Sequence, residues 1–129
     1  MKIMDSDHCV AILRGKLDLR TKVSPDDELA ITTVSIGELI HGAHRSQQVS
    51  ENLARLDVLL AALTVLSFDE FSARRFGIIK AGLENSGTLL HDLDLQIASI
   101  AIEYNLPLLT HNQKHFSRIK NLMLEDWLE

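Results

Sequence analysis

Three carboxylates and one carboxamide lie along this chain at places where an apolar, strand-like run ends or a helix begins. They are Asp5, Glu38, Asp94 and Asn112. Carboxylate oxygens are the ligands that hard divalent cations such as Mg²⁺ and Mn²⁺ prefer, and these cations assist phosphate chemistry by activating water and neutralising charge. An open α/β sheet brings the carboxyl ends of its parallel strands to one edge, so residues this far apart in sequence can meet there. The pattern therefore predicts a divalent-metal site for phosphate chemistry.

Three of these four side chains also fit an ordinary role at the beginning of a helix. Asp5 precedes a helical segment and suits its N-cap. Glu38 completes a capping box with Ser35, in which the carboxylate reaches back to the N-cap amide, and taken alone this pattern favours the cap. Asn112 likewise suits the N-cap of the helix that follows it. Because a carboxylate has two oxygens, capping and metal binding remain compatible for Glu38.

Asp94 carries the most specific signal, because it begins the apolar stripe of the helix expected over residues 94–103. That segment is apolar around most of its circumference, so we expect it to be buried. An isolated buried carboxylate is costly, and Asp94 must therefore be paired, bonded to N–H groups or bound to a metal. The N-terminus of the helix alone would also satisfy it. Asp92 projects to another side and is a candidate to pair with Asp94 behind the metal.

The surrounding sequence predicts strands that alternate with helices. Apolar, β-rich runs predict strands at residues 2–4, 29–34, 64–66, 107–110 and 122–124. Periodic apolar residues and turn signals predict helices at residues 7–14, 52–63, 69–84, 94–103 and 113–118, and one that begins at residue 35. This alternation is typical of an α/β fold with a mostly parallel sheet covered on both faces. We expect a single domain over residues 1–129.

The composition limits the classes of function. The formal net charge is −5, and there is no basic run, so the chain is a poor candidate for tight binding to duplex DNA. A lone cysteine, Cys9, excludes an internal disulfide. No segment has the roughly 18 consecutive apolar residues of a membrane span, and the start lacks the features of a signal peptide. We therefore expect a cytoplasmic protein without a membrane partner.

Other metal-binding patterns are incomplete. Glu38 and His41 have the spacing found in di-iron helix bundles, which need a second copy. His111 and His115 are four residues apart, as in zinc proteases, but the glutamate of that motif is missing. A phospho-accepting receiver domain also collects acids and Mg²⁺ at a sheet edge. It would need an acceptor aspartate after the third strand, where Asp69 more simply caps a helix, and a lysine that the later strands lack.

Taken in order, the motifs resemble the PIN-domain ribonucleases and, among them, the VapC-like toxins of type II toxin–antitoxin systems. The matching segments are residues 3–8, 33–42, 93–98, 108–112, 115–119 and 124–128. The likeness spans nearly the whole chain, with the motifs in the order of the family. It implies a three-layer α/β/α sandwich with a parallel sheet and acids at one edge. It also implies Mg²⁺- or Mn²⁺-dependent endonucleolytic cleavage of RNA.

The resemblance assigns roles to individual residues. Asp5, Glu38 and Asp94 match the metal-binding acids of the family. Ser6 matches the hydroxyl residue that follows the first acid. Asn112 matches the position of the fourth acid. The amide removes one negative charge there, which argues against a tightly held second metal.

The mechanism that the resemblance implies is hydrolysis of an RNA phosphodiester by metal-activated water, leaving a 5′-phosphate and a 3′-hydroxyl. We expect Thr110 to hold a metal-bound water or the substrate phosphate. Lys114 and Arg118 are candidates to grip RNA phosphates, although both also suit solvated helix charges. The family further implies a homodimer and an antitoxin whose tail covers the site. Because Asn112 replaces an acid, a PIN fold that binds RNA or protein without cleaving remains the alternative.

Overall fold

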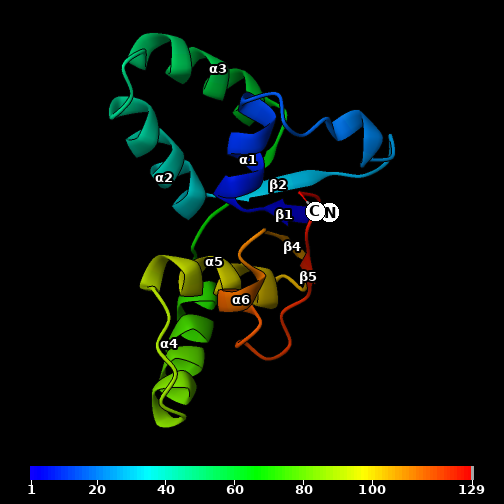
Figure 1. Cartoon of the computed structure of the whole chain (residues 1–129). Coiled ribbons are helices and arrows are strands. Elements are labelled where there is room, and N and C mark those ends of the chain that lie inside the picture. The colour runs from blue at the N-terminus through cyan, green and yellow to red at the C-terminus, as the bar shows by residue number, and fades with distance from the viewer. Residues whose placement is uncertain (129) are drawn as a thin grey trace.

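The computed structural model describes residues 1–128 of the 129-residue chain. The strands are β1 (Lys2–Met4), β2 (Leu29–Thr32), β3 (Thr64–Leu66), β4 (Leu108–Leu109) and β5 (Leu124–Glu125). The helices are α1 (Ser6–Leu13), the 3₁₀ helix η1 (Leu19–Thr21), α2 (Thr33–His44), α3 (Val49–Ala61), α4 (Glu70–Asn85), α5 (Asp92–Glu103) and α6 (Gln113–Phe116). Strands and helices alternate, which confirms the predicted α/β class (Figure 1). Within residues 1–128, no helix has both the length and the apolar character needed to cross a bilayer.

The five strands form one parallel sheet in the order β3-β2-β1-β4-β5. At its centre, Ile3 of β1 pairs with Ala30 of β2 on one side and with Leu108 of β4 on the other. Parallel neighbours cannot be joined by a tight turn, so their connections cross the faces of the sheet and carry helices. Figure 1 shows α1, α2 and α3 on one side of the sheet and α4, α5 and α6 on the other. The predicted three-layer arrangement is therefore confirmed.

Successive residues of the central strands enter two different hydrophobic cores. Ile3 and Leu108 face the core built with α5. The residues that follow them, Met4 and Leu109, face the core built with α1, α2 and α3. This is the alternation expected of a strand, whose side chains point to opposite faces in turn. Because both faces are covered, Ile3 and Met4 of β1 and Leu108 and Leu109 of β4 are all apolar and buried.

The carboxyl ends of β1 and β4 bring two distant loops together. Met4 pairs with Leu109, and the Asp5 N–H donates a hydrogen bond of 2.9 Å to the Leu109 carbonyl. Asp5 comes directly after β1 and Thr110 directly after β4, so the two residues lie side by side. The helix α2 begins directly after β2, the other neighbour of β1, so it starts from the same edge. This edge collects residues that are about a hundred positions apart, as the strand order of an open sheet allows.

The beginning of α2 differs from the sequence prediction. β2 ends at Thr32 rather than at residue 34, and the Thr32 hydroxyl oxygen accepts a hydrogen bond of 3.1 Å from the Ser35 N–H. Thr32 is therefore the N-cap, and the predicted capping box of Ser35 and Glu38 is wrong. Pairing of β2 with β3 ends where Thr32 lies opposite Leu66, which frees the chain to turn into a helix at that point. The Glu38 carboxylate is consequently not used for capping.

The other boundaries differ from the predicted ones by a few residues. The helix α3 begins at Val49 rather than at residue 52, and β5 lies at Leu124–Glu125 rather than at residues 122–124. The helix α5 begins at Asp92 rather than at Asp94, and His91 caps it by accepting the Leu93 N–H at its Nδ1 atom. Asp94 therefore lies within the first helical turn, where the helix dipole favours a negative charge.

Candidate active site

Asp5 lies at the carboxyl end of β1 and is the N-cap of α1. Only 7% of its surface is exposed. Its Oδ1 accepts the Ser6 N–H at 2.8 Å, and its Oδ2 accepts the Thr110 hydroxyl at 2.8 Å. Burial, followed by repulsion from Asp7, raises the pKa of Asp5 to about 6, although the bonds from Thr110 and Ser6 oppose this shift. A negative charge at this position is thus only partly compensated by the protein, which favours a bound cation.

Glu38 reaches the same edge from α2. Its Oε1 atom is buried and has no hydrogen-bond partner among the described residues. Burial raises the pKa of Glu38, and repulsion from Asp5 and Asp94 raises it further. Buried carboxylate oxygens are normally paired, because an unpaired one pays the full cost of losing its water. A cation or a hydrogen-bond donor would satisfy this oxygen.

Asp94 is half-buried in the first turn of α5. Burial raises its pKa, and repulsion from Asp7 adds to the shift, whereas the nearby His91 and His115 act in the opposite direction. The rest of the helix is packed into the core, with residues 95 and 97–101 buried as predicted. This packing fixes Asp94 at the edge of the sheet.

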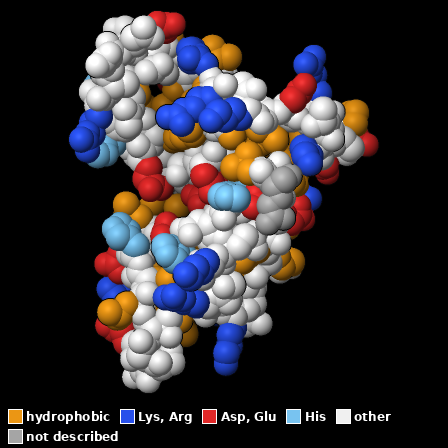
Figure 2. All heavy atoms as spheres, viewed as in Figure 1, with side chains coloured by type: hydrophobic (Ala, Val, Ile, Leu, Met, Phe, Trp, Pro, Cys, Tyr) orange, Lys and Arg blue, Asp and Glu red, His pale blue; other side chains and the backbone are white. Residues whose placement is uncertain are grey.

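The three carboxylates lie near one another, because Asp94 contributes to the raised pKa of Asp5, and Asp5 and Asp94 contribute to that of Glu38. Figure 2 shows acidic side chains in the hollowed waist between the two groups of helices, with histidines beside them. Among residues 1–128, no three His, Cys, Asp or Glu side chains lie close enough together to hold one metal ion in common. The donor set still fits Mg²⁺, which keeps several waters and usually takes only one or two carboxylates from a protein. The edge therefore suits an open, hydrated cation site.

Thr110 has a different role from the predicted contact with phosphate or metal-bound water. It is fully buried, its hydroxyl donates to Asp5, and its oxygen accepts the Asn112 N–H at 3.0 Å. The side chain points inward at the end of β4, where it supports Asp5, and the predicted contact with phosphate or metal-bound water stays a prediction. Ser6, by contrast, lines a hollow of about 470 Å³ together with Glu38. Its hydroxyl thus stays a candidate for a contact with substrate.

Asn112, which matches the fourth acid of the family, and the two basic residues after it, Lys114 and Arg118, have different surroundings. Asn112 occupies the N-cap position of α6, but its side chain makes no capping bond, and its amide Nδ2 instead lies 3.0 Å from Nδ1 of His115. Lys114 is exposed on α6. Arg118 is also exposed, but it borders a hollow beside α4 whose lining contains no acidic residue. Lys114 therefore remains the better candidate for a phosphate contact.

Asp92 does not pair with Asp94. It is exposed and forms an ion pair of 2.9 Å with Lys80 of α4. Residues two apart on a helix project to different sides. Asp94 therefore lies on the side of the apolar stripe, whereas Asp92 faces α4. The predicted pairing of Asp92 with Asp94 is therefore wrong.

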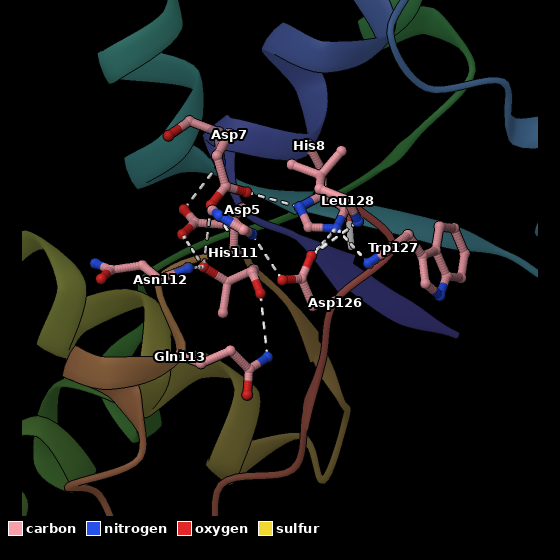
Figure 3. Close-up of polar contacts among 11 residues, drawn as sticks. Asp5, Asp7, His8, His111, Asn112, Gln113, Asp126, Trp127 and Leu128 are labelled. Carbon is pink, nitrogen blue, oxygen red and sulfur yellow. Dashed lines mark hydrogen bonds and ion pairs between the residues drawn. The ribbon is translucent and has the colours of Figure 1, made fainter.

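Four residues that sequence reasoning did not assign to the site form a hydrogen-bonded network beside it, which we call the Asp126 network (Figure 3). They are Asp7, His8, His111 and Asp126. Asp7 accepts from His8 Nδ1 at 2.7 Å and from the His111 N–H at 2.8 Å. Asp126 Oδ2 accepts from His111 Nδ1 at 2.7 Å. The Trp127 N–H donates to His8 Nε2 at 3.1 Å, which closes the network against the C-terminal segment.

Asp7 differs from Asp5 although the two are nearly adjacent in sequence. Burial raises the pKa of Asp7, but the hydrogen bonds from His8 and from the His111 N–H outweigh it and hold the pKa below its usual range. Both Asp7 oxygens are already bonded, so this residue is a fixed negative charge beside the site rather than an open ligand. The only sequence signal for it is a second acid in the segment Asp5-Ser6-Asp7.

Two competing chemistries are excluded. Burial, with repulsion from Asp5 and Asp7, raises the pKa of the Cys9 thiol to about 12, so Cys9 is no thiolate nucleophile at neutral pH. Asp69 would be the acceptor of a receiver domain, but its Oδ1 caps α4 by accepting the Ser72 N–H at 2.8 Å, and its Oδ2 accepts the Tyr104 hydroxyl. The predicted capping role of Asp69 is confirmed.

A parallel sheet between two helical layers, with acids from three elements at one edge, is the arrangement of a known family. The family model of the PIN domain matches residues 3–122, and the chain belongs to this family. The ribonuclease VapC2 of Rickettsia felis is 32% identical over 132 residues, which cover 97% of this chain and 96% of the relative. The chain is thus a VapC-type PIN domain, and the predicted resemblance is confirmed.

Two further comparisons agree with this assignment. The tRNA(fMet)-specific endonuclease VapC of Shigella flexneri is 30% identical over 97% of this chain and 96% of the relative. The crystal structure of DNA-bound VapBC from Salmonella typhimurium matches with a TM-score of 0.91 at 31% identity and covers 98% of both chains. Because these similarities extend over almost the whole chain, the receiver-domain alternative is wrong.

Proposed function

We propose that this protein is a divalent-metal-dependent endoribonuclease and acts as the toxin of a toxin–antitoxin pair. The relatives named ribonuclease and endonuclease support RNA as the substrate. The observation that carries the proposal is the buried Oε1 of Glu38, which has no partner among the described residues, next to Asp5 and Asp94, whose pKa values are raised. A cation stabilises such a cluster, and phosphodiester hydrolysis commonly depends on one held in this way.

In this proposal Asp5 and Asp94 hold Mg²⁺ or Mn²⁺ directly, and Glu38 binds it directly or through water. The bound cation supplies charge neutralisation at the phosphate and lowers the pKa of the attacking water. The protein's own contribution is to keep the ligand oxygens in place. The Ser6 N–H and the Thr110 hydroxyl each hold one oxygen of Asp5, so this carboxylate cannot rotate freely.

The remaining groups act on the substrate. We place the Ser6 hydroxyl and the Lys114 ammonium at RNA phosphates. Asn112 adds no charge at the position of the fourth acid, which supports a site for one cation rather than two. In-line attack by water leaves a 5′-phosphate on one RNA product and a 3′-hydroxyl on the other.

A toxin requires a neutralising partner, and the similar structure from Salmonella typhimurium is a VapBC assembly. We propose a corresponding antitoxin for this chain. The hollow of about 470 Å³ between α1, α2 and α3 is lined by Glu38, by the apolar Leu39 and Leu56, and by Arg14 and Arg55. This mixture of side chains suits an amphipathic peptide, and an occupant beside Glu38 would block access to the acids.

We also propose that the protein forms a homodimer and acts in the cytoplasm. Phe71 and Ile78 of α4 are 62% and 67% exposed, and apolar side chains of this size favour burial against a second surface. Sedimentation of the protein without its antitoxin checks the oligomeric state. A monomer at micromolar concentration would contradict the dimer.

Cleavage of a panel of total RNA by the purified protein tests the proposed activity. We expect cuts with Mg²⁺ or Mn²⁺, no cuts with EDTA, and none from the Asp94→Asn variant under any condition. If folded protein that is free of antitoxin makes no cut with either metal, the endoribonuclease proposal is wrong. A PIN fold that only binds its partners, the alternative that Asn112 leaves open, would then take its place.

A further inference from the structure

The C-terminal segment reaches back to the acid edge, although no residue of that segment is among the proposed ligands. Its hydrogen bonds to His8 and His111 join positions that are 119 and 15 residues apart in sequence (Figure 3). The Asp126 side chain is only 5% exposed. Its Oδ1 accepts the Leu128 N–H at 2.8 Å and its Oδ2 accepts His111 Nδ1, so both oxygens are in use.

The hydrogen bonds determine which nitrogen of His8 carries a proton. The Trp127 N–H donates to Nε2, so Nε2 is the acceptor and the neutral ring carries its hydrogen on Nδ1. This N–H then donates to Asp7 at 2.7 Å. His8 is fully buried, and it therefore transmits the position of the C-terminal segment to the Asp7 carboxylate through two directional bonds.

The second arm of the network runs through the loop after β4. Asp126 holds the His111 side chain, and the His111 N–H donates to Asp7 Oδ2 at 2.8 Å. The preceding residue, Thr110, donates its hydroxyl to Asp5. The position of His111 relative to Asp7 therefore sets the position of the hydroxyl that orients Asp5.

We propose that Asp126 is a positioning residue for the acid edge. By holding His111, it fixes the loop of Thr110 against Asp7 and thereby sets the orientation of the Asp5 carboxylate. The inference deepens the proposed function and rests on it only for its effect on catalysis. The described hydrogen bonds of Asp126 and of His111 go to each other, to the Leu128 N–H and to Asp7, so both residues act through Asp7 and the loop of Thr110.

Substitution of His111 gives the cleanest test, because its side chain is 63% exposed and its loss leaves little cavity. His111→Asn keeps a nitrogen donor close to the place of Nδ1, whereas His111→Leu removes it. Asp126→Ala removes the other partner of the same bond. Glu125→Gln is the matched control, because it weakens the 2.7 Å ion pair with Lys2 on the same segment and leaves the network intact.

Mn²⁺ binding to the protein alone and RNA cleavage are the first two measurements. We expect His111→Leu and Asp126→Ala to lower the Mn²⁺ affinity and kcat by about tenfold or more, the range found for groups that orient metal ligands. The KM for RNA should not change, because the network does not contact substrate. His111→Asn and Glu125→Gln should stay near the wild-type values. Equal losses in His111→Asn and His111→Leu would overturn the proposal, and so would wild-type values in His111→Leu.

Hydrogen exchange at the Ser6 amide tests the same linkage without metal or RNA. This N–H donates to the Asp5 carboxylate, so it should exchange faster in His111→Leu and at the wild-type rate in His111→Asn. Unchanged exchange in His111→Leu would overturn the positioning role. If the wild-type protein neither binds Mn²⁺ nor cuts RNA, the proposed function fails, and this measurement still decides the positioning role separately.

Discussion

The Thr110 hydroxyl donates a hydrogen bond of 2.8 Å to Asp5 Oδ2 and thereby joins two residues that are 105 positions apart in sequence. The bond lies at the carboxyl edge of two neighbouring strands, β1 and β4, and both partners are buried. It orients Asp5, the first of three carboxylates at this edge whose pKa values are all raised. The contact therefore depends on the pairing of β1 with β4 and fixes a carboxylate of the proposed metal site.

Removing this hydroxyl should affect both stability and activity. Thr110→Val keeps the shape of the side chain but leaves Asp5 Oδ2 without its donor, which should cost about 1–3 kcal/mol of unfolding free energy. Cleavage should fall because Asp5 loses its orientation. Urea denaturation and RNA cleavage rates check the two effects. Thr110→Ser keeps the donor and should retain most of the stability and most of the cleavage activity. If Thr110→Ser and Thr110→Val lose the same stability and activity, the hydroxyl does not have this role.

The raised pKa of Asp5 should be visible in the pH dependence of stability. The folded-state pKa of about 6 lies above the usual value of 3.8, so in this interval the folded protein binds more protons than the unfolded one. The unfolding free energy should therefore fall as pH rises from 3.8 to about 6 in metal-free buffer. Asp5→Asn should remove this loss and be more stable at neutral pH by about 2–3 kcal/mol.

Denaturation curves of the wild type and of Asp5→Asn across this pH interval give the comparison. The difference in unfolding free energy between the two proteins should be small in acid and grow toward neutral pH. Two parallel profiles would show that Asp5 has an ordinary pKa, and they would remove one argument for a cation site.

Divalent cations should stabilise the folded protein. A ligand that binds only the native state adds about 2.7 kcal/mol of unfolding free energy at a concentration a hundred times its Kd. Mn²⁺ should therefore raise the thermal midpoint of the wild-type protein and have little effect on Asp94→Asn. The same increase in both proteins would place the cation somewhere other than at the acid edge.

Glu38→Gln should separate activity from stability. The substitution removes a carboxylate that is repelled by Asp5 and Asp94, so the fold should be as stable as the wild type or more so in metal-free buffer. Cleavage should fall by about a hundredfold or more, as is common when charge stabilisation is lost at a reacting group. Asp92→Asn is the control, because it only breaks the exposed pair with Lys80 and should retain activity. Active Glu38→Gln would exclude Glu38 from the site.

Sequence patterns predicted the layers and the sheet well, because the apolar runs of β1 and β4 and the apolar circumference of α5 are local properties. They also placed Asp5, Glu38 and Asp94 after elements that meet at one edge. The helix start at Thr32 was missed because both Thr32 and Ser35 have hydroxyl groups that can cap. Only the end of the pairing between β2 and β3 decides between them.

The contacts of Thr110, Asp92 and the Asp126 network could not be derived in the same way. Thr110 and Asp92 have suitable chemistry, but the direction of each side chain depends on its neighbours in the fold. His8 looks like a residue of an amphipathic helix, and its partner Trp127 lies 119 residues away. Such contacts depend on which loops the finished sheet brings together, and a single sequence contains no local signal for that.

The chemistry of the product ends tests the central claim most directly. An RNA oligonucleotide with one cleavage site, treated with the wild-type protein and Mg²⁺, should yield a 5′-phosphate and a 3′-hydroxyl. Cleavage should persist when the 2′-hydroxyl at the scissile position is replaced by hydrogen, because water is the nucleophile. A 2′,3′-cyclic phosphate with a 5′-hydroxyl, formed equally well in EDTA, would contradict hydrolysis by water at a metal held by Asp5, Glu38 and Asp94.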